Sequence, residues 1–143
     1  MYSLLKNVHS YWALLVLLLL ILCILNAIAG KIKRKKFESN DLRLSLFALI
    51  FSHIQLLIEL ILYFVSPWFD QWSNLGLGGV IKNTQARLYL LENPFSNILA
   101  IILITIGWSL HIRQSDPSKK FLRIALFYGL GLLLLLRRIL WEI

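Results

Sequence analysis

Polar side chains recur along one side of an otherwise apolar stretch between residues 42 and 66. They follow one another at steps of seven, four and three residues, which places them on one face of an α-helix. The members of this polar face are Ser45, Ser52, Gln55, Glu59, Tyr63 and Ser66. A face of this kind avoids lipid, so we expect it to point into the protein interior or at a partner subunit.

Glu59 is the costly member of the polar face, because a carboxylate inside a hydrocarbon layer needs a partner. Arg137 and Arg138 close the last apolar stretch, and their long side chains can reach the same half of the membrane. We predict an intramembrane ion pair between Glu59 and one of these arginines that fastens two helices together. The alternatives are a proton or ion relay, a protonated Glu59, and a Glu59 that docks on another protein.

The three histidines raise the question of haem, because two imidazoles that face each other across a porphyrin can ligate its iron. At 1.5 Å per residue, His9 and His53 differ in depth by roughly 15–20 Å, and His111 lies at the far end. We therefore expect an interfacial His9, a buried and hydrogen-bonded His53 and a solvated His111. His9 or His53 serves as a haem ligand only with an unforeseen second ligand, such as Asn93 or a partner's residue.

No other group of residues has the spacing of a reactive site. The sequence has no metal-spaced Cys/His cluster, no phosphate-binding glycine loop and no HExxH motif. Its single cysteine, Cys23, lies inside an apolar stretch and is best explained as a small apolar filler. We predict no catalytic residues, no metal site and no enzyme activity.

Four long apolar stretches must position these residues, and they set the fold class. Hydrophobic residues make up 59% of the 143-residue chain. Each stretch is about as long as the ~20-residue helix that crosses a ~30 Å hydrocarbon layer, where backbone amides must pair within their own segment. We predict an all-α integral membrane protein with one domain, 1–143, that forms an antiparallel four-helix transmembrane bundle. The expected spans are about 9–29, 42–66, 95–113 and 119–141, with an outer loop at 67–94.

Local signals predict where these helices begin and end. Gly30 is expected to stop the first, residues 39–41 (Ser-Asn-Asp) to cap the second, and Pro67 to end it. In the outer loop we expect a short amphipathic helix at 81–91. Small residues would let helices approach closely, namely Gly107, Ala125, Gly129 and Gly131.

The net charge of +8 is carried beside the apolar stretches, a pattern of membrane orientation that argues against nucleic-acid binding. Ten cations lie in or beside the two short loops: Lys31, Lys33, Arg34, Lys35, Lys36, Arg43, Arg113, Lys119, Lys120 and Arg123. Five lie on the other side: Lys6, Lys82, Arg87, Arg137 and Arg138. This predicts short loops in the cytoplasm, with both termini and the long loop outside. The basic residues after the first stretch favour a retained span over a cleaved signal peptide.

Several segments together resemble a family of small four-span bacterial inner-membrane proteins known as cytochrome b or cytochrome b-like. The segments are His9-Ser10, 41–44 (DLRL), 53–58 (HIQLLI) with 60–64 (LILYF), 102–107 (ILITIG) and 124–128 (IALFY). The similarity covers most of the chain and is most specific through 53–64. It implies a bacterial inner-membrane location, b-type haem and electron transfer.

The chain departs from this family at positions that bear on haem. Relatives tend to have histidine in place of Asn93 and another histidine near Phe121. They also tend to have glycine in place of Glu59 and small residues in place of Arg137 and Arg138. The resemblance therefore implies descent from a haem protein, while one histidine of each implied ligand pair is missing here. No cofactor is favoured, and haem b is the alternative.

These observations predict a non-catalytic polytopic membrane protein, an accessory subunit of a larger inner-membrane complex. Its partners would be the lipid bilayer and other membrane protein subunits, with no nucleic acid. The first alternative is a b-type haem-binding electron-transfer protein. The second is a small transporter or ion-coupled protein centred on Glu59, although no broken helix or inverted repeat is seen.

Overall fold

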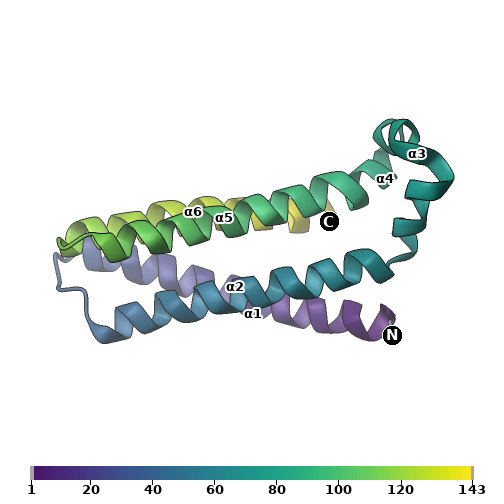
Figure 1. Cartoon of the computed structure of the whole chain (residues 1–143). Coiled ribbons are helices and arrows are strands. Elements are labelled where there is room, and N and C mark those ends of the chain that lie inside the picture. Colours follow the sequence, from purple (N-terminus) through teal and green to yellow (C-terminus); the bar gives the residue numbers. More distant parts are fainter. Residues whose placement is uncertain (1, 143) are drawn as a thin grey trace.

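The computed structural model describes the backbone of residues 2–142 and the side chains of residues 2–137. This part of the chain is 92% helical and contains no strand, so the predicted all-α class is confirmed. Four long helices account for most of it (Figure 1). They are α1 (Tyr2–Ile32), α2 (Ser39–Val65), α5 (Asn93–Arg113) and α6 (Pro117–Glu142).

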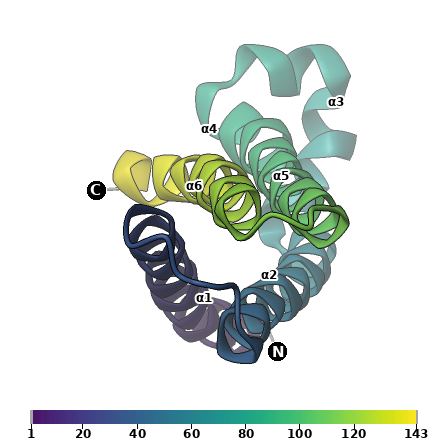
Figure 2. The ribbon, with the colours of Figure 1, turned by 90° about the vertical axis from the view of Figure 1, so that its left-hand side faces the viewer.

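The four long helices lie side by side, and each packs against two others. Helix α1 contacts α2 and α6, and α5 likewise contacts α2 and α6. Figure 2 looks along this arrangement from the end that carries the two short connections. The two chain termini and the segment between α2 and α5 lie toward the opposite end (Figure 1).

Three helical segments are long and apolar enough, by length and composition, to cross a membrane. Among the described residues these are Tyr2–Ile32, Ser39–Val65 and Thr84–Arg113, and they indicate membrane association. The expected fourth span is not among them. Its charge-free part, Ile124–Leu136, lies between Arg123 and Arg137. It covers only about 20 Å at 1.5 Å per residue, short of a ~30 Å hydrocarbon layer.

The core lies where the four long helices meet. Fully buried side chains come from each of them, including Leu20 of α1, Ala48 of α2, Ile104 of α5 and Tyr128 of α6. The outward surfaces of the same helices are also apolar. The large hydrophobic side chains exposed there include Leu14, Leu57, Phe95 and Leu133. Apolar surfaces on both the inside and the outside are typical of helices that contact lipid.

The connection between α1 and α2 differs from the prediction at both ends. Helix α1 continues past Gly30 to Ile32, and Arg34 takes the left-handed conformation (φ 54°) that glycine usually supplies at a helix end. The N–H of Lys35 donates to the Gly30 carbonyl at 3.1 Å, which closes this turn. The N-cap residue of helix α2 is Glu38 rather than one of residues 39–41, and Asp41 takes part as the N3 residue of its capping box. The predicted stop before Pro67 is confirmed, because α2 ends at Val65 with Ser66 as its C-cap.

The segment between α2 and α5 is a chain of short helices, so the single helix expected at 81–91 is wrong. The pieces are the 3₁₀-helix η1 (Pro67–Asp70), α3 (Gln71–Lys82), α4 (Thr84–Arg87) and the π-helical η2 (Leu88–Glu92). Asn83 divides the expected helix, because its side chain accepts a hydrogen bond from Ala86 N at 3.1 Å and caps α4. Val80, Ala86 and Leu90 form a small second core in this segment.

Two of the predicted small residues lie where α5 and α6 touch. A Cβ atom added to Gly131 would lie 2.7 Å from Ile104 Cγ1 and 3.0 Å from the Ala100 carbonyl oxygen. One added to Gly107 would lie 2.6 Å from Phe127 Cβ. Gly129 is different, because its Cβ would meet nothing within 4 Å. Glycine spacing alone therefore overstates the contact surface of α6.

We expect Gly131→Ala to lower the free energy of unfolding by about 1–2 kcal/mol, because the new methyl group must displace a buried side chain and a backbone carbonyl. Gly129→Ala, two residues away on the same helix, is the matched control and should leave stability unchanged or raise it slightly. Thermal unfolding of both variants in detergent, followed by circular dichroism, measures the difference. Equal behaviour of the two variants would contradict this view of the α5–α6 contact.

Candidate functional site

The polar face of α2 is turned toward the inside of the molecule. Ser45, Ser52 and Gln55 are buried, and Glu59 and Tyr63 are largely shielded. Ser66 lies at the end of α2 and accepts a hydrogen bond from Trp68 N at 3.2 Å, which starts η1. The face therefore divides into a part near the short connections, a middle part and an end at the C-terminus of α2.

The serines of this face are used within the fold. Ser45 Oγ donates to the Asp41 carbonyl at 3.0 Å, and Ser52 Oγ donates to the Ala48 carbonyl at 2.6 Å. The Tyr128 hydroxyl of α6 donates to the Ser45 carbonyl at 2.9 Å. Hydroxyls bonded to helix carbonyls are satisfied without any ligand, so this part of the face is structural.

The middle of the face meets His9 of α1. Gln55 Nε2 lies 2.7 Å from His9 Nδ1, 3.5 Å from the His9 carbonyl and 3.5 Å from Glu59 Oε1. The His9 carbonyl and Glu59 Oε1 are both acceptors, so the atom between them is assigned as the amide nitrogen of Gln55, which donates. His9 Nε2 lies 3.8 Å from Glu59 Oε1.

Of the two arginines predicted to pair with Glu59, the structure describes the side chain of Arg137. Arg137 Nη1 donates to Ser96 Oγ of α5 at 2.8 Å. The side chain of Arg138 lies outside the described residues. The pairing of Glu59 with one of the two arginines stays a prediction, and the described ionisable neighbour of Glu59 is His9. Sequence reasoning missed this contact, because α1 begins at Tyr2 and carries His9 two turns into the helix, whereas the first span was expected to begin at about residue 9.

Two of the expected histidine environments are wrong. His53 is exposed, with Nδ1 at 2.8 Å from the Leu49 carbonyl and Nε2 at 3.3 Å from Thr105 Oγ1 of α5. His111 was expected in solvent, yet it is fully buried, and its Nδ1 lies 2.7 Å from the Trp108 carbonyl. Its ring packs against Phe37 of the α1–α2 connection, with the two ring centroids 5.3 Å apart.

The predicted difference in depth between His9 and His53 is also wrong. His9 contacts Gln55, which is only two residues, or about 3 Å along the helix, from His53. The two rings nevertheless lie on different sides of α2, since residues two apart on a helix point about 200° apart. Gln55 meets α1, whereas His53 meets Thr105 of α5. The two imidazoles therefore do not suit the two axial positions of a single haem.

A cavity of about 830 Å³ adjoins the His9 site toward the end of the helices that holds the chain termini. It lies between the first half of α1, the second half of α2, η2 and the start of α5. Its polar lining consists of His9, Gln55, Glu59, Tyr63, Asn93 and Asn97, together with Lys6, Ser10, Ser66, Thr84 and Gln85. Tyr63 closes the outer end, because its hydroxyl donates to the Leu90 carbonyl at 3.1 Å and accepts from Trp72 Nε1 at 2.8 Å.

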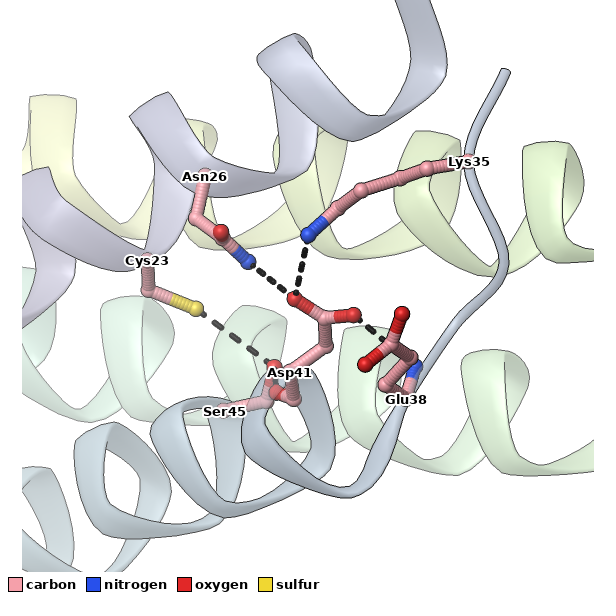
Figure 3. Close-up of polar contacts among 6 residues, drawn as sticks. All are labelled: Cys23, Asn26, Lys35, Glu38, Asp41 and Ser45. Atoms are coloured by element: carbon pink, nitrogen blue, oxygen red, sulfur yellow. Dashed lines mark hydrogen bonds and ion pairs between the residues drawn. The ribbon is translucent and has the colours of Figure 1, made fainter. Parts of the chain in front are cut away.

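A second polar cluster surrounds Asp41 at the opposite end of α2 (Figure 3). Asp41 Oδ1 accepts from Asn26 Nδ2 at 2.8 Å and from Lys35 Nζ at 3.2 Å, and Oδ2 accepts from Glu38 N at 2.8 Å. The Glu38 side chain accepts in turn from the backbone of Asp41, which completes a capping box. Both carboxylate oxygens of Asp41 accept hydrogen bonds from described groups of the chain. The cluster therefore joins α1, the α1–α2 connection and α2, and it offers no binding site.

The chemistry open to these groups is narrow. No three His, Cys, Asp or Glu side chains gather as a metal site within the described residues. Cys23 is buried, with Sγ 3.5 Å from Ser45 Oγ, in keeping with a packing role. The His9–Gln55–Glu59 group can hold a proton and form hydrogen bonds, but it includes no hydroxyl or thiol nucleophile.

Comparisons with known proteins add no family. No family model, no curated protein and no solved structure matches the chain. The resemblance to cytochrome b-like proteins stays an expectation from the sequence.

We expect Asp41→Ala to lower the free energy of unfolding by about 2–4 kcal/mol, because it removes a helix cap and leaves the Asn26 amide without its carboxylate partner. Asn40→Ala is the matched control, since Asn40 is exposed and its loss should change stability by less than about 0.5 kcal/mol. Chemical or thermal unfolding in detergent measures both. A stable Asp41→Ala variant would show that the cluster does not hold the α1–α2 pair.

Proposed function

We propose that the chain is a multi-pass protein of the bacterial inner membrane in which α1, α2, α5 and α6 form an antiparallel four-helix transmembrane bundle. The three helices long and apolar enough to span, and the apolar outward surface of α6, support this. Helix α6 crosses as the fourth member through its packing against α1 and α5. The arginines at the two ends of its apolar part extend toward the membrane surfaces or toward polar partners such as Ser96.

The orientation places the two short basic connections in the cytoplasm. Both connections lie at the same end of the helices, and most of the cations lie beside them. Both termini and residues 67–94 are then outside, together with the cavity.

Within the membrane we propose a non-catalytic role as an accessory subunit of a larger complex. This proposal is supported by the polar face of α2, whose residues form their hydrogen bonds inside the fold. Ser45 and Ser52 bond helix carbonyls, Gln55 bonds His9, and Tyr63 bonds Leu90. The surface left for other molecules on the long helices is apolar, and that suits lipid and neighbouring membrane subunits.

A second candidate is an ion-coupled protein centred on Glu59. It is favoured by one observation, the His9–Glu59 contact at the wall of a cavity. Ionisable pairs beside cavities are common in proton and ion pathways. Loss of proton uptake by reconstituted vesicles on Glu59→Gln, with the fold intact, would place this candidate first.

The topology can be measured with single cysteines, because the only native cysteine, Cys23, is buried and provides the background control. We expect Ser3→Cys and Asn74→Cys to react with a membrane-impermeant maleimide in intact spheroplasts. Ser115→Cys, in the connection between α5 and α6, should react only after lysis. All three positions are exposed. Labelling of Ser115→Cys before lysis would overturn the proposed orientation.

The subunit role predicts co-purification. Affinity purification of the tagged chain in a mild detergent should yield other membrane chains in fixed ratio, and these should be lost in a harsh detergent. The absorbance of the same sample tests the haem alternative: we expect no Soret band. A monodisperse chain without companions contradicts the subunit role, and a Soret band with sharp bands on reduction favours the electron carrier.

A further inference from the structure

The cavity near the outer end is large enough for a lipid-sized molecule. Its volume of about 830 Å³ lies within the range of small-molecule and cofactor sites. If each non-hydrogen atom with its hydrogens takes up about 30 Å³, the volume of a water molecule, the cavity holds about 28 such atoms. A single acyl chain with a small head group fits this space.

Two residues that line the cavity each have a buried amide oxygen without a hydrogen-bond partner among the described residues. Gln55 is 5% exposed and Asn97 is 3% exposed, and both residues line the cavity. In each, the carbonyl oxygen of the side chain is the atom left without a partner. Two acceptors, the His9 carbonyl and Glu59 Oε1, lie beside the Gln55 amide nitrogen, so turning the amide over would face its oxygen toward acceptors and would not supply the missing bond. Buried acceptors without partners are rare and costly in folded proteins.

The chemistry of these atoms defines what would satisfy them. A carbonyl oxygen only accepts, so a ligand must bring a donor, which is a hydroxyl or an amine. The apolar part of the wall includes Leu14, Leu17, Leu60 and Leu135. The ligand must therefore combine a donor head with an apolar chain.

The cavity is open on the apolar outside of the molecule. Leu14 lines it and is 64% exposed, and Ile98 lines it from α5 and is also exposed. In Figure 1 helices α1 and α6 draw apart toward this end. In the membrane of the proposed function, an amphipathic molecule reaches the cavity from the lipid without crossing water.

We propose that this cavity binds a lipid with a hydroxylated head group, with its hydroxyls at Gln55 and Asn97 and its acyl chain along the leucines. The proposal rests on the membrane setting proposed above but not on the subunit role. The small side-chain rotations of Gln55 and Asn97 that expose their oxygens accompany binding.

The test uses the purified full chain in lauryldimethylamine oxide, a detergent whose head accepts hydrogen bonds but does not donate them. The probe is 1-monooleoylglycerol, and the matched control is methyl oleate, which has the same chain and no donor. We expect 1-monooleoylglycerol to raise the Tm in a saturable manner and methyl oleate to leave it unchanged. Glycerol alone, at the same concentration, tests a water-soluble source of the same head group and should have no effect.

Two variants locate the site. Asn97→Leu keeps the size of the side chain and removes the acceptor, and it should weaken binding of 1-monooleoylglycerol about five-fold, the effect of one neutral hydrogen bond. Its control is Asn74→Leu on the exposed part of α3, which should bind as the unchanged chain does. Ala13→Phe, which places a ring in the cavity, should abolish binding.

Each opposite result overturns the proposal: no Tm change with 1-monooleoylglycerol, an equal effect of methyl oleate, an equal effect of glycerol, or unchanged binding by Asn97→Leu and Ala13→Phe. These outcomes are independent of the cysteine labelling and the co-purification. A chain that binds the probe but purifies without companions would lose its subunit role and keep its lipid site.

Discussion

The hydrogen bonds between α1 and α2 fix which way α2 faces, and much of the molecule follows from that choice. Asn26 bonds Asp41 near the short connection, Trp12 Nε1 donates to the Phe51 carbonyl at 2.9 Å, and His9 meets Gln55 beyond it. Polar groups inside an apolar molecule are costly unless they are paired. With these groups paired to α1, the side of α2 turned away from α1 carries exposed apolar side chains such as Leu57, beside the polar His53.

The two ends of the helices differ in how they are filled. Near the short connections, Gly30 lies so close to the Phe121 ring that a Cβ would come within 2.6 Å of it, and the Asp41 cluster takes up the remaining polar groups. Toward the termini α1 and α6 draw apart (Figure 1), and the cavity lies at this end, lined in part by residues of α4 and η2. Tight packing at one end holds the fold and leaves the other end free to accommodate a ligand.

The periodicity of polar residues gave the composition of the α2 face and the helical class, because both depend on local spacing. The contacts of that face could not be predicted from local spacing. They depend on the register of α1 against α2, and that register depends on α1 beginning at Tyr2, several residues before its apolar run. Because the first span was expected to begin at about residue 9, the predicted depth of His9 relative to His53 was also wrong. The burial of His111 was missed because it requires Phe37 to fold back from the connection, a contact between distant residues. The cavity has no local signature at all.

The bond from the Tyr128 hydroxyl to the Ser45 carbonyl joins α6 to α2, two helices that are not neighbours in the chain. Its partners are separated by 83 residues, so a growing chain leaves the ribosome with α2 already made and this tie still missing. The first helical hairpin is therefore complete before the last helix can bond to it. Any shortened chain that ends before residue 128 keeps the α1–α2 contacts but lacks this tie.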